Sequence, residues 1–280
     1  MAKKPRVALI VGSGSVKCAA ALGLWKALDR AGIPIDMLVG CSGGSLYTST
    51  MALGFSLDEC ISYTKALWNE KVTAEKNWKA LLGMVFPKLF KFDHHFGMIS
   101  DRQMMKNLRQ VFGNKTFQDA KIPLTIMTTD FYTGEQVPLT SGSIVDAIRA
   151  SIAIPFIWGA HQVGDRFLID GAASDPMPVD IAIKEGAEVI LAMGFQAPLP
   201  SKVRSVSRYA FHVNGIMTNN LYQSNFAFHN AVHHAEIIPI FPQFDRSIRL
   251  FDTDQIPYVI EQGEKAAEEQ MPYIQKLLNS

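Results

Sequence analysis

The first fifty residues alternate between short apolar runs that end near glycine and longer stretches that suit helices. Residues 6–11 and 35–39 are the apolar runs, and their length and composition predict buried strands. Residues 17–31 place apolar side chains on one helical face and stop before Gly32. Residues 43–53 form a second predicted helix of small residues. This alternation predicts an α/β fold in which helices connect parallel strands.

The rest of the chain continues with elements of both kinds. Strands are expected at 123–130, 135–139, 166–169, 188–193 and 236–241, the first two as a hairpin. Capping boxes at Ser56–Glu59 and Ser100–Gln103 begin two further helices, the second of which runs to about Val111. A last helix is expected at 256–278. Residues 197–201 suit a linker because they contain two prolines, but no clear boundary appears, so we predict one domain over residues 1–280.

Composition excludes several classes of protein. Hydrophobic residues make up 48% and charged residues 19% of the chain, which is typical of a globular protein rather than a disordered one. The 27 Lys and Arg residues balance 26 Asp and Glu residues, which argues against a nucleic-acid partner. Three cysteines are too few for a disulfide framework and show no C-x-x-C spacing.

Two stretches superficially resemble export or membrane signals. The basic start followed by the apolar run 7–11 is short and is interrupted at Lys17, so no signal peptide is expected. Residues 37–57 carry no charge but are rich in Gly, Ser and Thr, unlike a spanning helix. We therefore expect a cytoplasmic protein whose only membrane contact is transient and at the surface.

The sequence Gly-Cys-Ser-Gly-Gly at 40–44 matches G-x-S-x-G, the pattern of a tight strand-to-helix turn that presents a serine hydroxyl. It stands between a predicted strand and a predicted helix, which is the setting that such a turn requires. The start of that helix directs amide groups and the positive dipole end toward Ser42. Ser42 is therefore a candidate nucleophile, although such pentapeptides also arise by chance.

A second glycine-containing loop, Gly-Ser-Gly-Ser-Val-Lys at 12–17, follows the first strand. A dinucleotide loop is disfavoured because Lys17 takes the place of the third glycine, and a phosphate loop lacks its Gly-Lys-Ser/Thr. Parallel neighbouring strands would bring this loop close to Ser42, where its amides could bind an oxyanion. The alternative is a turn that only lets a helix pack closely.

A third candidate is Asp170, which with Gly171 and Ala172 follows the predicted strand 166–169. An aspartate at the end of a strand could accept the proton of Ser42. An Asp-Gly pair is also an ordinary turn, and this segment alone favours that interpretation.

Taken together and in this order, the segments 12–17, 40–44 and 170–172 resemble the patatin-like phospholipase family, most of all its compact bacterial members. Thr129-Asp130 with 133–135, and Ala150-Ser151 with Ile154-Pro155, extend the resemblance over residues 6–195. The resemblance implies a three-layer α/β/α sandwich with a mostly parallel central sheet. It also implies hydrolysis of acyl ester bonds in lipids without a metal or organic cofactor.

The same resemblance assigns roles to individual residues. It makes Ser42 the nucleophile and Asp170 the second member of a Ser–Asp dyad. It assigns the oxyanion hole to the amides of Gly12, Ser13, Gly14 and Ser15. Lys17 is either a contact for an anionic head group or a solvated helix residue.

The chain departs from the family pattern in this loop. The family has a run of glycines before the basic residue, whereas here Ser13 and Ser15 interrupt the glycines and Cys18 follows Lys17. A side chain restricts the backbone conformations that such a loop can adopt. A weakly active or inactive regulatory or adaptor protein on the same fold therefore remains an alternative to the hydrolase.

Histidines support two weaker alternatives. Four follow Asp170, as in a His-dependent α/β-hydrolase: His212, His229, His233 and His234. Ser42 lies after only the second predicted strand, which argues against that fold. The pairs His94-His95 and His229/His233 could bind a metal, but no third ligand is evident, so no metal site is predicted.

The segment 67–98 carries Trp68, Trp78, Phe86, Phe90, Phe92 and Phe96, with Lys88 and Lys91 among them. Basic residues among aromatic ones suit a lid over an apolar site or a face that meets a membrane. An irregular segment packed on the core is the alternative. The partner expected from these features is a lipid or acyl-ester substrate, and the sequence indicates no oligomeric state.

Overall fold

A computed structural model describes residues 4–68, 71–86, 89, 92–197, 202–204, 206–249 and 252–279. At its centre lies one eight-stranded mixed sheet, in which hydrogen-bonded neighbours follow the order β5-β6-β3-β2-β1-β7-β8. β2 and β6 pair with successive parts of one edge of β3, and β4 pairs with the opposite edge. The strands are β1 (Val7–Val11), β2 (Met37–Cys41), β3 (Leu124–Asp130), β4 (Gln136–Leu139), β5 (His161–Val163), β6 (Arg166–Asp170), β7 (Val189–Met193) and β8 (Glu236–Ile240).

The sheet is parallel in its long middle part and antiparallel at one side. β3, β2, β1, β7 and β8 pair in parallel, while β4 and β6 run antiparallel to β3 and β5 runs antiparallel to β6. The predicted mostly parallel sheet and the predicted β3–β4 hairpin are therefore confirmed.

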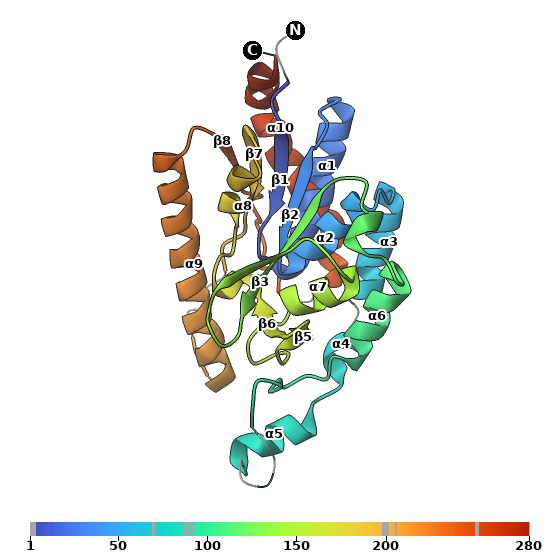
Figure 1. The fold of residues 1–280 in the computed structure, drawn as a ribbon, viewed down its shortest axis with the longest axis vertical. Helices are drawn as coiled ribbons and strands as arrows, with labels where there is room; N and C mark the ends of the chain where they lie inside the picture. Colours follow the sequence, from blue (N-terminus) through green and yellow to red (C-terminus); the bar gives the residue numbers. More distant parts are fainter. Residues whose placement is uncertain are drawn as a thin grey trace.

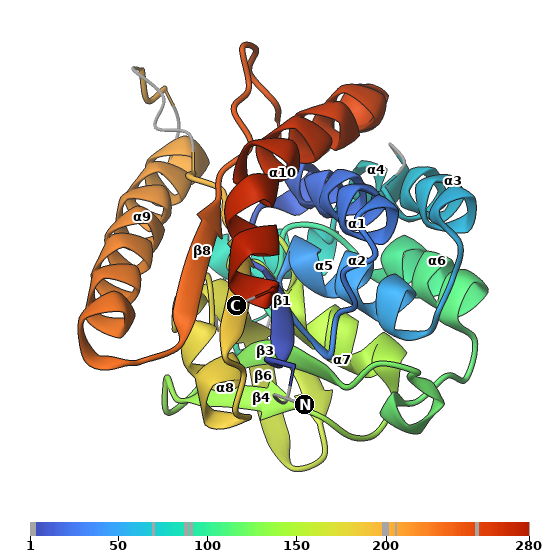
Figure 2. The same ribbon diagram turned by 90° about the horizontal axis from the view of Figure 1, so that it is seen from above.

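Helices cover both faces of the sheet (Figures 1 and 2). One face carries α1 (Ala20–Arg30), α2 (Gly43–Ala52), α3 (Leu57–Leu67), α6 (Arg102–Phe112), α7 (Ile144–Ser151) and α10 (Ile256–Leu278). The other carries α8 (Val179–Lys184) and α9 (Val206–Val232). Alternate side chains of β1 enter the two cores: Val7, Leu9 and Val11 on the first face, and Ala8 and Ile10 on the second. This arrangement is the predicted three-layer α/β/α sandwich.

The C-terminal helix belongs to the larger of the two cores. α10 lies along α1, and the two helices approach so closely that a Cβ on Gly23 would lie 2.0 Å from the Ile260 carbonyl oxygen. A Cβ on Gly263 would lie equally close to the carbonyl oxygen of Ala20. Helix backbones can come this near only where neither carries a side chain. α10, which lies beyond the residues 6–195 that carry the family resemblance, thus packs directly on α1.

Two predicted details of the helices are corrected. The Ser56–Glu59 capping box forms at the start of α3, but the one at Ser100–Gln103 does not. α6 begins at Arg102 with Asp101 as its N-cap, and Ser100 accepts instead from the amide of Arg102 at 3.4 Å. The aromatic and histidine-bearing segment after the proposed linker, for which no helix was predicted, forms the 27-residue α9. Residues 198–201 of that linker lie outside the described residues.

The segment 67–98 contains two short helices, α4 (Lys71–Ala74) and α5 (Trp78–Val85), and α5 extends beyond the sandwich (Figure 1). Several of its large apolar side chains face solvent: Trp78, Leu82, Phe86, Leu89 and Phe92. Trp68, in contrast, is fully buried. Lys88, Phe90 and Lys91 lie outside the described residues. The described part of the chain contains no helix that combines the length and the hydropathy needed to cross a membrane.

Candidate active site

Ser42 lies between β2 and α2, at the turn from strand to helix. Its backbone has φ 53° and ψ −128°, a conformation that a residue with a side chain rarely adopts. Such a residue stores on the order of 1–3 kcal/mol of strain unless its surroundings hold it in place. The amide of Ser42 donates to Ser151 Oγ at 2.9 Å, and that hydroxyl donates to the Met127 carbonyl at 2.7 Å. Ser151 therefore anchors the turn to β3.

The glycines around Ser42 are required by close approach. A Cβ on Gly44 would lie 2.0 Å from the Val11 carbonyl oxygen, and one on Gly40 would lie 2.6 Å from the Cα of Ser45. Real Cβ atoms do not come that close to backbone atoms, so the turn can pack against β1 and its own helix only with glycine at both positions. The predicted strand–turn–helix is present.

The register of β3 explains why Asp170 comes close to Ser42. Cys41, the last residue of β2, pairs with Met127, while Asp170, the last residue of β6, pairs with the next residue, Thr128. β4 pairs with both of these β3 residues from the opposite edge, so β2 and β6 share one edge of β3. Because β6 runs against β2, the carboxyl ends of the two strands meet there. Ser42 follows directly and faces the aspartate.

The two side chains are hydrogen-bonded. Ser42 Oγ donates to Asp170 Oδ2 at 2.6 Å, and the amide of Ala172 donates to Asp170 Oδ1 at 2.9 Å. Both side chains are buried, at 3% and 4% exposure. Burial raises the pKa of Asp170 to about 7, and the hydrogen bonds from Ser42 and Ala172 oppose that rise. A carboxyl group with this pKa can both accept and release a proton near neutral pH.

The loop at 12–17 lies beside the turn, but it offers fewer amides than predicted. Gly12 donates to the Met193 carbonyl at 2.9 Å and Ser13 to the Pro176 carbonyl at 2.8 Å. These two amides already have acceptors, so their predicted part in an oxyanion hole has less support than that of Gly14 and Ser15. Within the described residues, the amide of Gly14 has no hydrogen-bond partner, and Gly14 lines the cavity described below. Ser15 also lines the cavity and has φ 52°.

The first residue of α2, Gly43, lies against this loop. A Cβ on Gly43 would lie 2.6–2.9 Å from backbone atoms of Ser15, so the loop and the helix start are in direct contact. The amide of a first helical residue has no acceptor within its own helix, and it carries the positive end of the helix dipole. Gly14 thus lines the cavity together with Ser42, and the Gly43 amide lies at the start of the helix that follows Ser42.

A cavity of about 440 Å³ opens above Ser42 and Asp170. Its lining is largely apolar and includes Ile154, Pro155, Ile157, Phe195, Phe211 and Ile248. α9 contributes one wall, since Phe211, Asn214, Gly215 and Thr218 belong to it. The volume lies within the range usual for small-molecule sites.

Two cationic side chains also line the cavity, Lys17 and Arg249. Lys17 Nζ donates to the Gln196 carbonyl at 2.9 Å, and burial lowers the pKa of this lysine. Lys17 is therefore tethered at the cavity rather than fully solvated. Arg249 is exposed.

Several other residues that the sequence suggested for the site do not line the cavity. Within the described residues, neither a histidine nor any part of the segment 67–98 lines the cavity. The described part of that segment therefore does not form a lid over the cavity. The cavity wall comes instead from α9, which sequence reasoning missed. Ser151 belongs to the Ala150-Ser151 stretch of the family resemblance, but no local sequence pattern indicates that it anchors the turn at Ser42.

The cysteine beside Ser42 is not available as a nucleophile. Cys41 is buried, and its Sγ donates to the Asp175 carbonyl at 3.4 Å on the opposite face of the sheet from α2. Burial, followed by the nearby Asp170 and Asp175 carboxylates, raises the pKa of its thiol. All three cysteines are free and buried.

Comparison with known proteins places this site in a family context. The profile described as "Patatin-like phospholipase" matches residues 9–183. A relative described as an uncharacterized NTE family protein, from Mycobacterium tuberculosis, is 30% identical over 189 residues, which are 68% of this chain and 49% of the relative. Neuropathy target esterase sws of Drosophila melanogaster is 27% identical over 189 residues, covering 67% of this chain and 13% of that protein. This chain thus spans about half the length of the mycobacterial relative.

Among solved structures, VipD from Legionella pneumophila aligns with a TM-score of 0.50 at 12% identity. The alignment covers 99% of this chain and 67% of that one. At this identity, the similarity concerns the fold alone.

Proposed function

Because the chain belongs to the patatin-like phospholipase family, we propose that it is a serine acyl hydrolase that cleaves carboxylic ester bonds of lipids. The 2.6 Å hydrogen bond from Ser42 to the buried Asp170, at the base of an apolar cavity, is the observation that carries this proposal. The alcohol, the carboxylate and an opening for substrate meet at one point.

In the proposed mechanism, Ser42 Oγ attacks the ester carbonyl while Asp170 accepts its proton. The amides of Gly14 and Gly43, with the dipole of α2, stabilise the oxyanion of the tetrahedral intermediate. Asp170 then gives the proton to the departing alcohol, which leaves an acyl-Ser42 ester. Water attacks this ester, Asp170 accepts the proton of the water, and the fatty acid departs as Ser42 recovers its hydrogen.

The cavity indicates the class of substrate. Its apolar lining suits an acyl chain, while the ammonium of Lys17 and the guanidinium of Arg249 suit an anionic head group. We therefore expect single-chain or two-chain phospholipids to be better substrates than short neutral esters. The exposed apolar residues of α5 and of the chain just after it are proposed to meet the lipid surface transiently: Trp78, Leu82, Phe86, Leu89 and Phe92.

The domain organisation is part of the proposal. β8 extends the same sheet that carries Ser42, and α10 packs on α1. These contacts support a single hydrolase domain over residues 1–280.

A covalent labelling experiment tests the activity. A fluorophosphonate probe should label the wild-type protein and the Ser49→Ala variant, but not Ser42→Ala. Ser49 is a suitable control because it is a buried serine of α2, the helix that follows Ser42, and its hydroxyl has no partner in the described part of the chain. A panel of short esters, lysophospholipids and two-chain phospholipids should give turnover with the same dependence on Ser42.

The loop geometry favours one second candidate, an adaptor protein that retains the fold with little turnover. Ser15 adopts φ 52°, where glycine is favoured, and the Ser13 amide is already bonded to Pro176. Both observations weaken the oxyanion hole. If neither labelling nor ester turnover depended on Ser42, the adaptor would replace the hydrolase. If one histidine proved as essential as Ser42, the His-dependent alternative would replace the dyad.

A further inference from the structure

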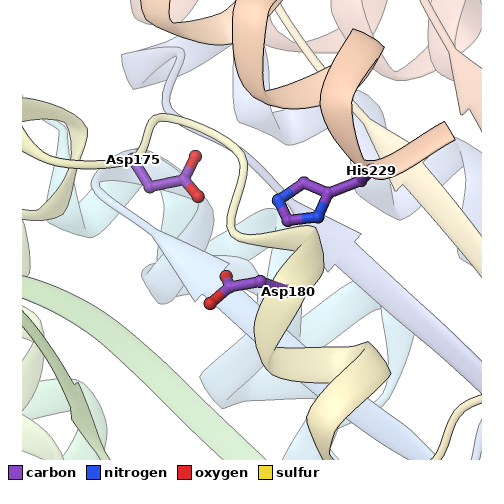
Figure 3. Close-up of side chains that lie close together, drawn as sticks. All are labelled: Asp175, Asp180 and His229. Carbon is purple, nitrogen blue, oxygen red and sulfur yellow. The ribbon is translucent and has the colours of Figure 1, made fainter. Parts of the chain in front are cut away.

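A second cluster of polar side chains lies five residues beyond Asp170, on the other side of the short turn Gly171–Ala173. It consists of Asp175, Asp180 and His229, and one ligand atom from each lies within 4.8 Å of the other two. Figure 3 shows that the three side chains converge from different parts of the chain: the loop before α8, the first turn of α8 and the last turns of α9.

Two members of the cluster are buried and Asp180 is half-buried, and each has a buried polar atom without a hydrogen-bond partner in the described part of the chain. Asp175 is 1% exposed and His229 is 8% exposed. Asp175 Oδ2, Asp180 Oδ1 and His229 Nδ1 are each buried without a partner in the described part of the chain. Buried polar atoms are normally satisfied, and three unpartnered atoms on side chains that converge point to a missing guest such as an ion.

The remaining contacts of the cluster orient it. Asp175 Oδ1 accepts from the amide of Met177 at 3.0 Å, which leaves Oδ2 directed at the cluster. Asp180 Oδ2 accepts from Lys184 at 2.8 Å, a pair on the solvent side of α8 in which the lysine side chain is 73% exposed. One exposed lysine cannot neutralise two carboxylates inside, so the cluster has the charge to receive a divalent cation.

We propose that Asp175, Asp180 and His229 bind a divalent transition-metal ion, with Zn²⁺ and Mn²⁺ as the chemical class of ligand. Two carboxylates and one imidazole suit these ions, whereas Ca²⁺ and Mg²⁺ prefer oxygen ligands alone. Ligand atoms around one such ion stand roughly 3–3.5 Å apart for bond lengths near 2.1 Å. A fourth position would remain for water.

The sequence pattern indicates only part of this site. It pairs His229 with His233, one helical turn later, but the centroids of those rings stand 5.7 Å apart and His233 is exposed outside the cluster. The true neighbours of His229 are two aspartates about fifty residues earlier, which only the packing of α8 on α9 brings near. The prediction that no metal site exists is therefore replaced by this proposal.

An ion at this position would act on the wall of the cavity. α9 lines the cavity with residues around Gly215 and supplies His229 farther along the same helix. Asp175 follows the turn that carries Asp170, and its carbonyl accepts from Cys41, the residue before Ser42. The ion would thus fasten α9 to the segment between Asp170 and α8. No step of the proposed hydrolysis passes through it.

Direct binding measurements test the proposal. The full chain, stripped of metal with EDTA and dialysed, is titrated calorimetrically with Zn²⁺, Mn²⁺, Ca²⁺ and Mg²⁺ in separate experiments. We expect one equivalent of Zn²⁺ or Mn²⁺ to bind saturably, with Ca²⁺ and Mg²⁺ at least about tenfold weaker. Co²⁺ should bind to the same site and give visible absorption bands that Zn²⁺ abolishes.

Variants locate the site. His229→Gln should weaken Zn²⁺ affinity at least about tenfold and remove the Co²⁺ bands, whereas His233→Gln should behave like wild type. Asp180→Asn provides the same test through a near-isosteric change if His229→Gln folds poorly by circular dichroism. Saturable binding that depends on His229 or Asp180 supports the site. No saturable binding to the wild-type protein at millimolar metal, or equal binding by wild type, His229→Gln and Asp180→Asn, would overturn it.

Discussion

Two buried carboxylate clusters flank the turn Gly171–Ala173, and they differ in how fully their hydrogen bonds are satisfied. Asp170, on one side, accepts from Ser42 and from Ala172, so both carboxylate oxygens have donors. Asp175, on the other side, has one oxygen bonded to Met177 and one without a geometric hydrogen bond among the described residues, while the Asn225 side chain lies near enough to lower the pKa of this carboxyl group. The first cluster is complete with protein atoms alone. The second has unpartnered atoms for which we propose a metal ion, so the same residue type at positions 170 and 175 leads to different proposals.

The largest effect that would sharpen this contrast is the loss of the Asp170 carboxylate. Asp170→Asn keeps the shape of the side chain but cannot accept the proton of Ser42, so we expect turnover to fall by about 10⁴-fold. Ester hydrolysis under saturating substrate measures this effect, and Asp165→Asn, in the exposed β5–β6 turn, is the matched control. Zn²⁺ binding should survive in Asp170→Asn. Turnover within tenfold of wild type would remove Asp170 from the mechanism.

The next largest effect is the pH dependence of turnover, which reports on Asp170. Because burial raises the pKa of Asp170 to about 7, the carboxylate needed as the base is mostly protonated in acid. We expect kcat/KM to rise about tenfold per pH unit below pH 7 and to level off above it, which is roughly 100-fold between pH 5 and the plateau. An unperturbed aspartate would give a plateau from about pH 5 upward. That earlier plateau would contradict the assignment of Asp170 as the base.

The same raised pKa has a consequence for stability. An unfolded aspartate has a pKa near 3.9, so between pH 4 and 7 the folded protein binds more protons at this position than the unfolded chain. The contribution of Asp170 to the free energy of unfolding therefore falls as pH rises through this window, by at most about 4 kcal/mol. The loss should disappear in Asp170→Asn, which denaturant titrations at pH 5 and pH 8 can measure.

A smaller effect is expected from the anchor of the turn. Ser151→Ala removes the acceptor for the Ser42 amide and the donor to the Met127 carbonyl, leaving two buried backbone groups unpaired. Each such group costs about 1–3 kcal/mol, and the strained Ser42 backbone loses its tether. We expect kcat to fall about tenfold with little change in KM. Ser49→Ala is the control, and an unchanged kcat in Ser151→Ala would show that the turn holds without the anchor.

The turns that carry Ser42 and Asp170 were easier to predict from the sequence than the strand order that brings them together, and the reasons are physical. Ser42, Gly44 and Asp170 belong to turns whose local geometry demands particular residue types, and such demands are visible within a few positions. Thr128 and Met127, which fix the meeting of β2 with β6, are ordinary strand residues, so nothing local encodes their register. The order of the strands had to come from the structure.

The helix α9 illustrates the opposite case. Its 27 residues mix aromatic, polar and small side chains without a clear apolar stripe, because one end lines a cavity and the other covers polar residues. A helix face with such neighbours does not show the usual 3.6-residue pattern. The hydrogen bonds of the loop 12–17 could not be predicted for another reason. The Gly12 and Ser13 amides donate to the carbonyls of Met193 and Pro176, which are about 160–180 residues away in sequence.

The smallest effect is also the sharpest test of the contrast between the clusters, because its sign should change with metal. Asp175→Asn keeps the acceptor for the Met177 amide and places an N–H donor toward Asp180 Oδ1, which lacks a partner. In EDTA, the free energy of unfolding should therefore be unchanged or about 1 kcal/mol higher than in wild type. In excess Zn²⁺, the wild type gains about 2.7 kcal/mol at a metal concentration one hundred times Kd, and the variant, lacking one ligand, gains little. The wild type should thus be the more stable of the two proteins in Zn²⁺ but not in EDTA, whereas Asp165→Asn should follow wild type in both. A variant that is less stable than wild type by the same amount in both buffers would mean that Asp175, like Asp170, already has all the partners it needs.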